Sequence, residues 1–505
     1  MKQILLSFSL VICVSLTGQT TYQNVYNILQ ANCATYCHGP GHSSGLDLTG
    51  NSNSVYNQLV GVDPTNAVSA GKGEKRVYAG DPYRSQLFRK INNGLAADVS
   101  LEAGEGNPMP DGQPGLDDKD IEMVRQWILY GARQGGNQIN PSKIADYYDN
   151  FGIPSMPTPP APPAAGEGFQ VHFGPFFLSP GEEEEYYFKY DTKLPTTQEI
   201  SRIDVIMGDF SHHFLIYRYL APGASSQPYG LRSQPDHAYQ DLVYGTQFSD
   251  SMLLPQGTAF SWGTNTVLDL NSHYINYSTT NTTSNEVYMN VYTQPAGTAA
   301  QLMTTQIAPN LNIYIPNNSQ EYTFSDEVFD NGAGEVFLWG VTTHTHQYGS
   351  DYDVYLRNPN GTKGTHIFDA SCGATNGIPG CGTEIYDYQH PPLRKFDSFL
   401  PVMGNEGFIH EASYINDGPS PVQFGLTSDD EMMVLGLYYL EDTTGLGAFG
   451  DTTFTALEEI TANHIRVFPV PATDYVVFKM SNGFGEETAL EVFDMVGRKV
   501  HTESM

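Results

Sequence analysis

Five histidines and one methionine stand in short apolar segments of β-like composition, spread over about 220 positions between residues 212 and 432. Imidazole binds copper in both oxidation states, and a soft thioether sulfur favours Cu(I). Three imidazoles followed by two imidazoles and a thioether therefore make a ligand set suited to copper. The candidate ligands are, in chain order, His212, His213, His273, His344, His346 and Met432.

The spacing of these residues determines which of them can bind the same metal ion. In His344-Thr-His346 both imidazoles lie on one face of a strand, because side chains alternate with a period of two. Adjacent residues such as His212 and His213 point to opposite faces of a regular strand, so they share a metal only at a bulge or a strand end. Any one of these histidines alone is more often a packed or surface residue. Their combination is what indicates copper.

In identity, order and spacing the six ligands resemble those of the copper type II, ascorbate-dependent monooxygenases, the family of peptidylglycine hydroxylase and dopamine β-hydroxylase. The resemblance spans about residues 170–441 and implies two jelly-roll-like halves with one copper each. The first half would carry the three-histidine site, formed by His212, His213 and His273, and the second the His–His–Met site, formed by His344, His346 and Met432. The resemblance implies that the copper of the three-histidine site stores and delivers an electron. It also implies that the copper of the His–His–Met site binds O₂ and a small-molecule substrate. The three ligands of that copper are the candidate catalytic residues. Ascorbate is the co-substrate that the resemblance implies.

The chain also departs from that family at the substrate pocket and at one disulfide. Peptidylglycine hydroxylases hold a substrate carboxylate with an Arg two residues before His-x-His, where this chain has Thr342. The Asn and Tyr that follow the ligand Met are here Val434 and Gly436, and a family cystine is replaced by Ala412 and Met433. A peptide ending in glycine is therefore not the expected substrate, and no other substrate is indicated.

The segment Asn32–Gly39 contains Cys33-Ala-Thr-Tyr-Cys37-His38, one residue longer than the usual Cys-x₂-Cys-His attachment of c-type haem. Met109, before a predicted helix, is a candidate second axial ligand. Together with Ser44–Leu48 these residues resemble planctomycete-type cytochrome c domains, which implies a covalent haem with His/Met ligation. The alternative is a Cys33–Cys37 disulfide with a surface histidine. Cys372 and Cys381 form a second local pair, expected to be a disulfide.

Composition bounds the class of protein. The chain has 505 residues, which predicts several domains, and a net charge of −32, which argues against binding nucleic acid or anionic membranes. Only 16% of residues are charged, and the 50 Gly and 32 Pro suit exported β-rich modules with many turns. The partners that the resemblance to the copper monooxygenases implies are a small-molecule substrate and O₂.

Both ends of the chain carry targeting signals. Residues 1–19 predict a signal peptide, with Lys2 before an apolar stretch too short to span a bilayer, and no other segment predicts a transmembrane helix. Residues 463–505 resemble a truncated C-terminal sorting domain of the type IX secretion system. That implies the type IX machinery as a partner and a secreted or cell-surface location. The alternative is an ordinary small β domain.

Between these ends we expect four units. Residues 20–135 form a small all-α, cytochrome c-like domain with helices near residues 25–29, 85–91 and 117–128. Residues 136–167 form a linker that is Pro-rich and extended over 154–167. All-β sandwiches follow over 168–300 and 301–445, with strands around 214–219, 287–292, 336–339 and 433–440.

The resulting hypothesis is a secreted copper monooxygenase that hydroxylates a C–H bond with O₂ and takes electrons from ascorbate or its own haem domain. Two other functions are compatible with parts of the sequence. A cell-surface protein with degenerate copper sites could bind glycans or proteins, although six intact ligands count against decay. An electron-transfer or copper-storage protein would cycle its metals without inserting oxygen.

Overall fold

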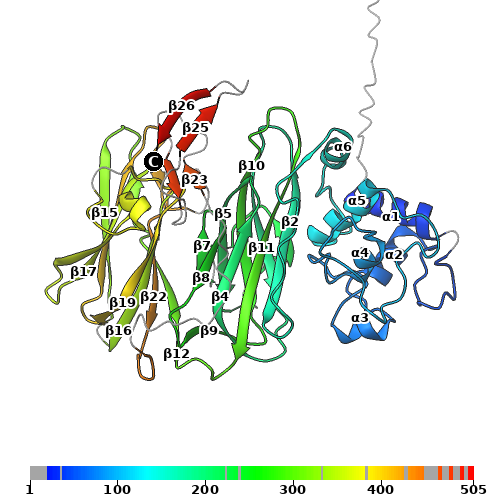
Figure 1. Cartoon of the computed structure of the whole chain (residues 1–505), viewed down its shortest axis with the longest axis horizontal. Helices are drawn as coiled ribbons and strands as arrows, with labels where there is room; N and C mark the ends of the chain where they lie inside the picture. The colour runs from blue at the N-terminus through cyan, green and yellow to red at the C-terminus, as the bar shows by residue number, and fades with distance from the viewer. Residues whose placement is uncertain are drawn as a thin grey trace, which may run out of the picture.

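The computed structural model describes residues 20–447 apart from 35–36, 222–224, 237–239, 331, 333, 382–384 and 426–429, and beyond 447 the backbone of four short strands. Figure 1 shows a helical unit beside two β-rich units that follow one another along the long axis. The predicted signal peptide over 1–19 lies outside the described residues. No helix in the described part of the chain has the length and apolarity needed to cross a bilayer.

The N-terminal unit is helical, as predicted. Asp117 caps α5 by accepting a hydrogen bond from the Lys119 amide, and Asp118 and Asp120 lie favourably in its first turn. All residues of this helix from Ile121 to Leu129 are buried, and the ring of Trp127 packs against that of Tyr22 in α1. The helices are α1 Thr21–Leu29, a π-helical turn Gln30–Ala34, α2 Ser52–Leu59, α3 Ala67–Gly71, α4 Gln86–Ile91, α5 Asp118–Leu129 and α6 Pro141–Asp149.

The prediction of a linker over 136–167 is wrong for its first part, because Pro141–Asp149 forms helix α6. Asn140 caps this helix, Ile144 is buried in the helical core, and the Tyr148 hydroxyl donates to Glu122 at 3.0 Å. The Pro-rich part is largely without regular structure, but it lies along the first sandwich. Its carbonyls at Pro160 and Ala161 accept hydrogen bonds from side chains of strands β2 and β11.

The first β-sandwich encloses a core of about thirty buried residues between two sheets. The strands predicted over 214–219 and 287–292 are confirmed as parts of β5 and β11. One sheet contains β1 Ile153–Pro154, β2 Gly168–Leu178, β4 Gln198–Met207, β8 Asp250–Leu253, β9 Thr258–Trp262, β11 Thr283–Pro295 and β12 Gln301–Leu302. The other has the order β6 Gly230–Arg232, β3 Glu183–Asp191, β10 Val267–Ile275, β5 Ser211–Tyr219 and β7 Gln240–Thr246.

The second β-sandwich is built from two four-stranded sheets around a separate core. Strand β15 alternates exposed and half-buried residues along its whole length, as a strand with one solvated face does. One sheet has the order β13 Thr304–Pro309, β22 Val434–Leu440, β16 Glu335–His344 and β19 Leu393–Met403. The other has the order β15 Glu321–Val328, β20 Phe408–Ile415, β17 Gly349–Arg357 and β18 Lys363–Asp369. A separate two-stranded sheet pairs β14 Tyr314–Ile315 with β21 Val422–Gln423.

The two sandwiches share apolar contacts. Trp339 of β16 and Tyr438 and Leu440 of β22 are buried in the core cluster of the first sandwich, not in that of the second. The second sandwich therefore docks on the first through a continuous buried surface. Beyond residue 447 the described backbone forms two hairpins, β23 Ile465–Phe468 with β24 Val477–Met480 and β25 Ala489–Phe493 with β26 Lys499–Ser504. The side chains of the predicted sorting domain lie outside the described residues.

The predicted disulfide between Cys372 and Cys381 is confirmed. Cys372 is fully buried, in a short 3₁₀-helix (Ala370–Thr375) after β18, and the bridge spans nine residues. A loop of this size limits the freedom of the unfolded chain by about 2–3 kcal/mol. We expect the double replacement Cys372→Ser and Cys381→Ser to lower the free energy of unfolding by that amount in denaturant titration. A fall that dithiothreitol does not reproduce in the unmodified protein would contradict this assignment.

A buried ion-pair cluster joins the helical unit to the first sandwich. His172 of β2 lies between Asp98, at 3.4 Å, and Glu286, at 2.6 Å. Its ring is also sandwiched between Tyr83 and Tyr288, with ring centroids 4.5 and 4.0 Å away. Burial alone lowers the pKa of His172, but the hydrogen bonds and charges of the two carboxylates outweigh it and raise the pKa above its usual value.

This arrangement predicts a pH dependence of stability. Because the folded pKa of His172 lies above the unfolded value of about 6.5, its contribution is fully present below that pH. The contribution is lost as the pH rises through the folded pKa. We expect the stability difference between the unmodified protein and His172→Gln, measured by urea unfolding, to shrink from about pH 6 to about pH 9. A constant difference over that range would argue for a neutral, purely packed His172.

Candidate metal centres

The three-histidine site is formed by two neighbouring strands of one sheet. His213 on β5 pairs directly with His273 on β10, and the next register pair along the ladder is Ser211 with Tyr274. His212 is thus the extra residue of a β-bulge. The bulge is the condition that the sequence set for two adjacent histidines to share a metal, and the structure meets it.

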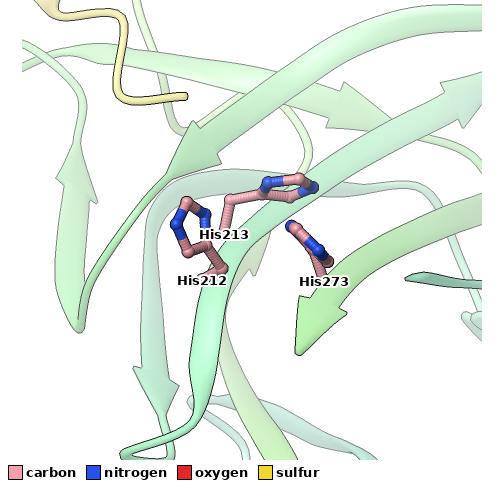
Figure 2. A group of neighbouring side chains, drawn as sticks. All are labelled: His212, His213 and His273. Atoms are coloured by element: carbon pink, nitrogen blue, oxygen red, sulfur yellow. The ribbon is translucent and has the colours of Figure 1, made fainter. Parts of the chain in front are cut away.

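The three rings lie around a common space, as Figure 2 shows. One nitrogen of each of His212, His213 and His273 lies within 4.8 Å of the other two. The ring centroids of His212 and His213 both lie close to that of His273, at 5.1 and 5.2 Å. The structure therefore brings together the three ligands predicted for the first copper, although they come from positions 60 residues apart in sequence.

Hydrogen bonds at the periphery orient two of the rings. Nε2 of His213 lies 3.1 Å from Oδ1 of Asn271, and Nε2 of His273 lies 2.7 Å from a carboxylate oxygen of Glu183. Nδ1 is the ring nitrogen that these bonds leave for a metal. Nδ1 of His212 is buried and makes no hydrogen bond with the described residues. Outer carboxylate and amide partners of this kind hold metal-binding histidines in one tautomer, so the donor set fits a copper ion.

The electrostatics of the site keep the imidazoles of His212 and His273 neutral. Burial, followed by the neighbouring rings of His390 and His273, lowers the pKa of His212 to about 3. Burial and then His213 also lower the pKa of His273. A metal competes with protons for the same nitrogen lone pairs. At neutral pH the imidazoles of His212 and His273 are thus already in the form that binds a metal.

The His–His–Met site lies at one end of the second sandwich. β16 ends at His344, which pairs with Val434 at the start of β22, so the residues just beyond each strand end face one another. The rings of His344 and His346 have centroids 5.1 Å apart at 79°. Nδ1 of His346 lies 3.0 Å from the carbonyl oxygen of Asp430.

A buried carboxylate ties the two segments of this site together. The two oxygens of Glu431 accept hydrogen bonds from the backbone N–H groups of His346 (2.9 Å), Tyr348 (2.7 Å) and Met432 (3.0 Å). The Glu431 side chain has no exposed surface, and burial raises its pKa to about 7 against the lowering effect of the three amides. Met432 itself is buried, and its carbonyl accepts a hydrogen bond from Tyr414 at 2.7 Å. Glu431 therefore fixes both ligand segments at once.

The residues of the predicted haem site lie in the helical unit. The thiols of Cys33 and Cys37 are not bonded to each other, which differs from the alternative of a disulfide. Cys33 and Met109 pack against the same helical core. Nδ1 of His38 is 3.3 Å from the Ser44 hydroxyl, so Nε2 is the nitrogen suited to an axial ligand. These donors are compatible with a c-type haem.

Several residues that support the sites were not predicted from the sequence. Glu431 directly precedes Met432, so its place in an acidic run beside a candidate ligand was a usable signal. The partners of the three-histidine site come from strand β3 and from a loop of the second sandwich, and nothing local to the ligand motifs marks them. They are Glu183, Glu185 and His390.

No family model matches the sequence, and no curated protein matches it either. Among solved structures, a recombinant N-glycanase F (PNGase F) covers 55% of this chain and 96% of its own, at 11% identity and a TM-score of 0.24. A triple jelly-roll protein of an archaeal virus covers 55% and 59%, at 10% identity and a TM-score of 0.17. The PBSX exported protein XepA covers 56% and 89%, at 9% identity and 0.17. Scores this low carry no inference about function.

Proposed function

We propose that this chain is an exported copper-dependent monooxygenase that inserts one oxygen atom of O₂ into a C–H bond of a small molecule. The observation that carries the proposal is the bulge at His212, which brings three imidazoles around one space. A His–His–Met set on the adjacent sandwich adds a second site of different chemistry. Copper supplies the one-electron and O₂ chemistry. The protein supplies fixed donors and separates them into two domains.

The two sites suit different tasks. The three-histidine site offers only nitrogen donors, which serve both copper oxidation states and so suit electron storage. The His–His–Met site adds a buried thioether that favours Cu(I), the state that reacts with O₂. We also propose that the two sandwiches are jelly-roll-like halves and that each holds one copper site.

Two electron sources are proposed for the copper sites. Ascorbate is one candidate. The other is a c-type haem held by Cys33, Cys37 and His38, with Met109 as the second axial ligand. A cytochrome c-like helical unit on the same chain would deliver electrons without a separate partner protein. Export by the signal peptide and the type IX machinery would place the enzyme at the cell surface or outside the cell.

The position that holds the carboxylate-binding arginine in peptidylglycine hydroxylases offers no such anchor in this chain, which supports a departure from peptide substrates. Thr342, at the position of the family arginine, donates its hydroxyl hydrogen bond to the carbonyl of Pro392 at 3.1 Å. A threonine already engaged in this way offers neither charge nor a spare donor for a carboxylate. The substrate class we propose is therefore a small molecule without a terminal carboxylate.

The test is metal content followed by turnover. Protein matured where haem is attached is assayed for copper by elemental analysis and for haem by the pyridine haemochrome spectrum. We expect two coppers and one covalent haem per chain, and O₂-dependent hydroxylation with ascorbate in a substrate screen. Copper with reversible redox cycling but no oxygenated product would favour an electron carrier. A chain that binds no copper would overturn the proposal.

A further inference from the structure

A loop of the second sandwich reaches the three-histidine site of the first. The ring centroid of His390 lies 4.7 Å from that of His212, at an interplanar angle of 38°. This separation is shorter than those between His273 and its two partners in the site, which are 5.1 and 5.2 Å. His390 is half-buried there. A fourth imidazole thus borders the site from the side of His212, outside the group of three whose ligand nitrogens all lie within 4.8 Å of one another.

His390 is held in the manner of a metal ligand. Its Nδ1 lies 2.6 Å from a carboxylate oxygen of Asp387, and its backbone N–H donates to the Asp387 carbonyl at 3.1 Å. A carboxylate on one ring nitrogen fixes the tautomer and directs the other nitrogen, here Nε2, toward a metal. The same principle operates at His273, whose Nε2 contacts Glu183. The carboxylates therefore hold opposite ring nitrogens in the two residues, Nε2 in His273 and Nδ1 in His390.

Hydrogen bonds on both sides of His390 tie its segment to the His–His–Met site and to the first sandwich. The Tyr386 hydroxyl lies 2.6 Å from the hydroxyl of Thr345, the residue between His344 and His346. At the other end, the Pro391 carbonyl accepts a hydrogen bond at 3.3 Å from Gln247 of the first sandwich. The position of His390 therefore depends on the docking of the two sandwiches, and the loop that carries it also contacts the His–His–Met site.

We propose that His390 moves onto the copper of the three-histidine site as a fourth imidazole donor, supplied across the boundary between the sandwiches. This inference rests on the proposed copper function. Tetragonal nitrogen ligation favours Cu(II), so a fourth imidazole stabilises the oxidised ion relative to Cu(I) and lowers its reduction potential. A site completed in this way is assembled only when the second sandwich is docked, which couples the electron-storing centre to the domain where O₂ reacts.

The experiment isolates one copper. In the full chain carrying His344→Ala and His346→Ala, the remaining Cu(II) reports the three-histidine site alone. His390→Ala and Asp387→Asn are compared with Gln389→Ala, a control on the same turn whose side chain is exposed. The readouts are the number of imidazole ligands from X-ray absorption and pulsed EPR, the Cu(II) dissociation constant, and the reduction potential from a mediated redox titration. Circular dichroism verifies that each variant is folded.

We expect His390→Ala to lose one imidazole, to bind Cu(II) about tenfold more weakly and to have a higher reduction potential, with Asp387→Asn similarly weakened. Gln389→Ala should match its parent. The imidazole count is repeated in the otherwise unchanged chain loaded with two coppers, in case the double background does not fold. Unchanged imidazole number and affinity in His390→Ala would overturn this inference and leave the proposed function standing. Failure of the unmodified chain to bind copper would overturn both.

Discussion

Replacing His213 by alanine is expected to reduce the copper content of the chain from two ions to one. His213 pairs with His273 across the β5–β10 ladder, and its ring is oriented by Asn271. Loss of an outer-shell partner alone weakens metal binding by about 10–100-fold, so loss of a direct ligand should exceed about 100-fold. The copper at the His–His–Met site should remain, because its ligands lie on the other sandwich. Product formation with ascorbate should fall to background, because the electron-storing site is missing.

The measurement is copper per chain by elemental analysis, together with the Cu(II) EPR spectrum. His42→Ala is the matched control, because this histidine lies in the helical unit and contacts His38 rather than either copper site. Copper content should be unchanged in that variant. If His213→Ala kept two coppers with an unaltered spectrum, the three-histidine cluster would be a packing feature and the proposed function would lose its main support.

The sequence predicted the two ligand sets because copper chemistry restricts the residue types and strands restrict their spacing. His344 and His346 could be placed on one side from the period of two alone. The pair His212–His213 could only be given a condition, since a bulge depends on how two strands align, and that alignment is set by residues far away. The observed register step beside His273 supplies this condition.

Elements with strong local signals were predicted and those with tertiary causes were not. Helix α5 has an Asp cap, acidic first turn and apolar face, and all three are visible in the sequence. Helix α6 follows a Gly-rich stretch and precedes a Pro-rich one, and only Ile144 of its residues is buried. Its stability comes instead from contacts with other elements, such as the ring of Tyr147 against Phe177 of β2 at 5.0 Å. Such contacts cannot be read from composition.

The same distinction separates the ligands from the residues that hold them. Metal ligands are few in kind, whereas an outer partner is any group that the fold brings within hydrogen-bonding distance. Asp387 and His390 illustrate this, because they lie in a loop more than 170 residues from His212 and belong to the other sandwich. Their connection with the copper site follows from domain docking, which a single sequence does not disclose.

Glu431 is the clearest residue of this second kind, and its replacement by glutamine is expected to disable the His–His–Met site. Its carboxylate accepts three backbone hydrogen bonds, from His346, Tyr348 and Met432, without any exposure to water. Glutamine keeps one acceptor oxygen but turns an NH₂ group toward amide donors. Each buried donor left without a partner costs about 1–3 kcal/mol, so the free energy of unfolding should fall by about 3 kcal/mol.

Copper binding should change selectively in Glu431→Gln. The two ligand segments are no longer fixed to each other, so affinity at the His–His–Met site should fall by about 10–100-fold while the three-histidine site keeps its copper and its EPR spectrum. Glu411→Gln is the matched control. Glu411 lies on β20 of the same sandwich, half-buried and paired with exposed Lys363, and such a pair contributes about 0–1 kcal/mol.

Two features of the result would separate a positioning role from simple destabilisation. Copper affinity measured well below the unfolding transition should still fall in Glu431→Gln, because the ligands lose their mutual alignment even where the sandwich is folded. The effect should also be confined to one site, whereas general unfolding would release copper from both. Full copper loading and unchanged stability in Glu431→Gln would mean that His346 and Met432 are positioned by the strand pairing of β16 and β22 alone.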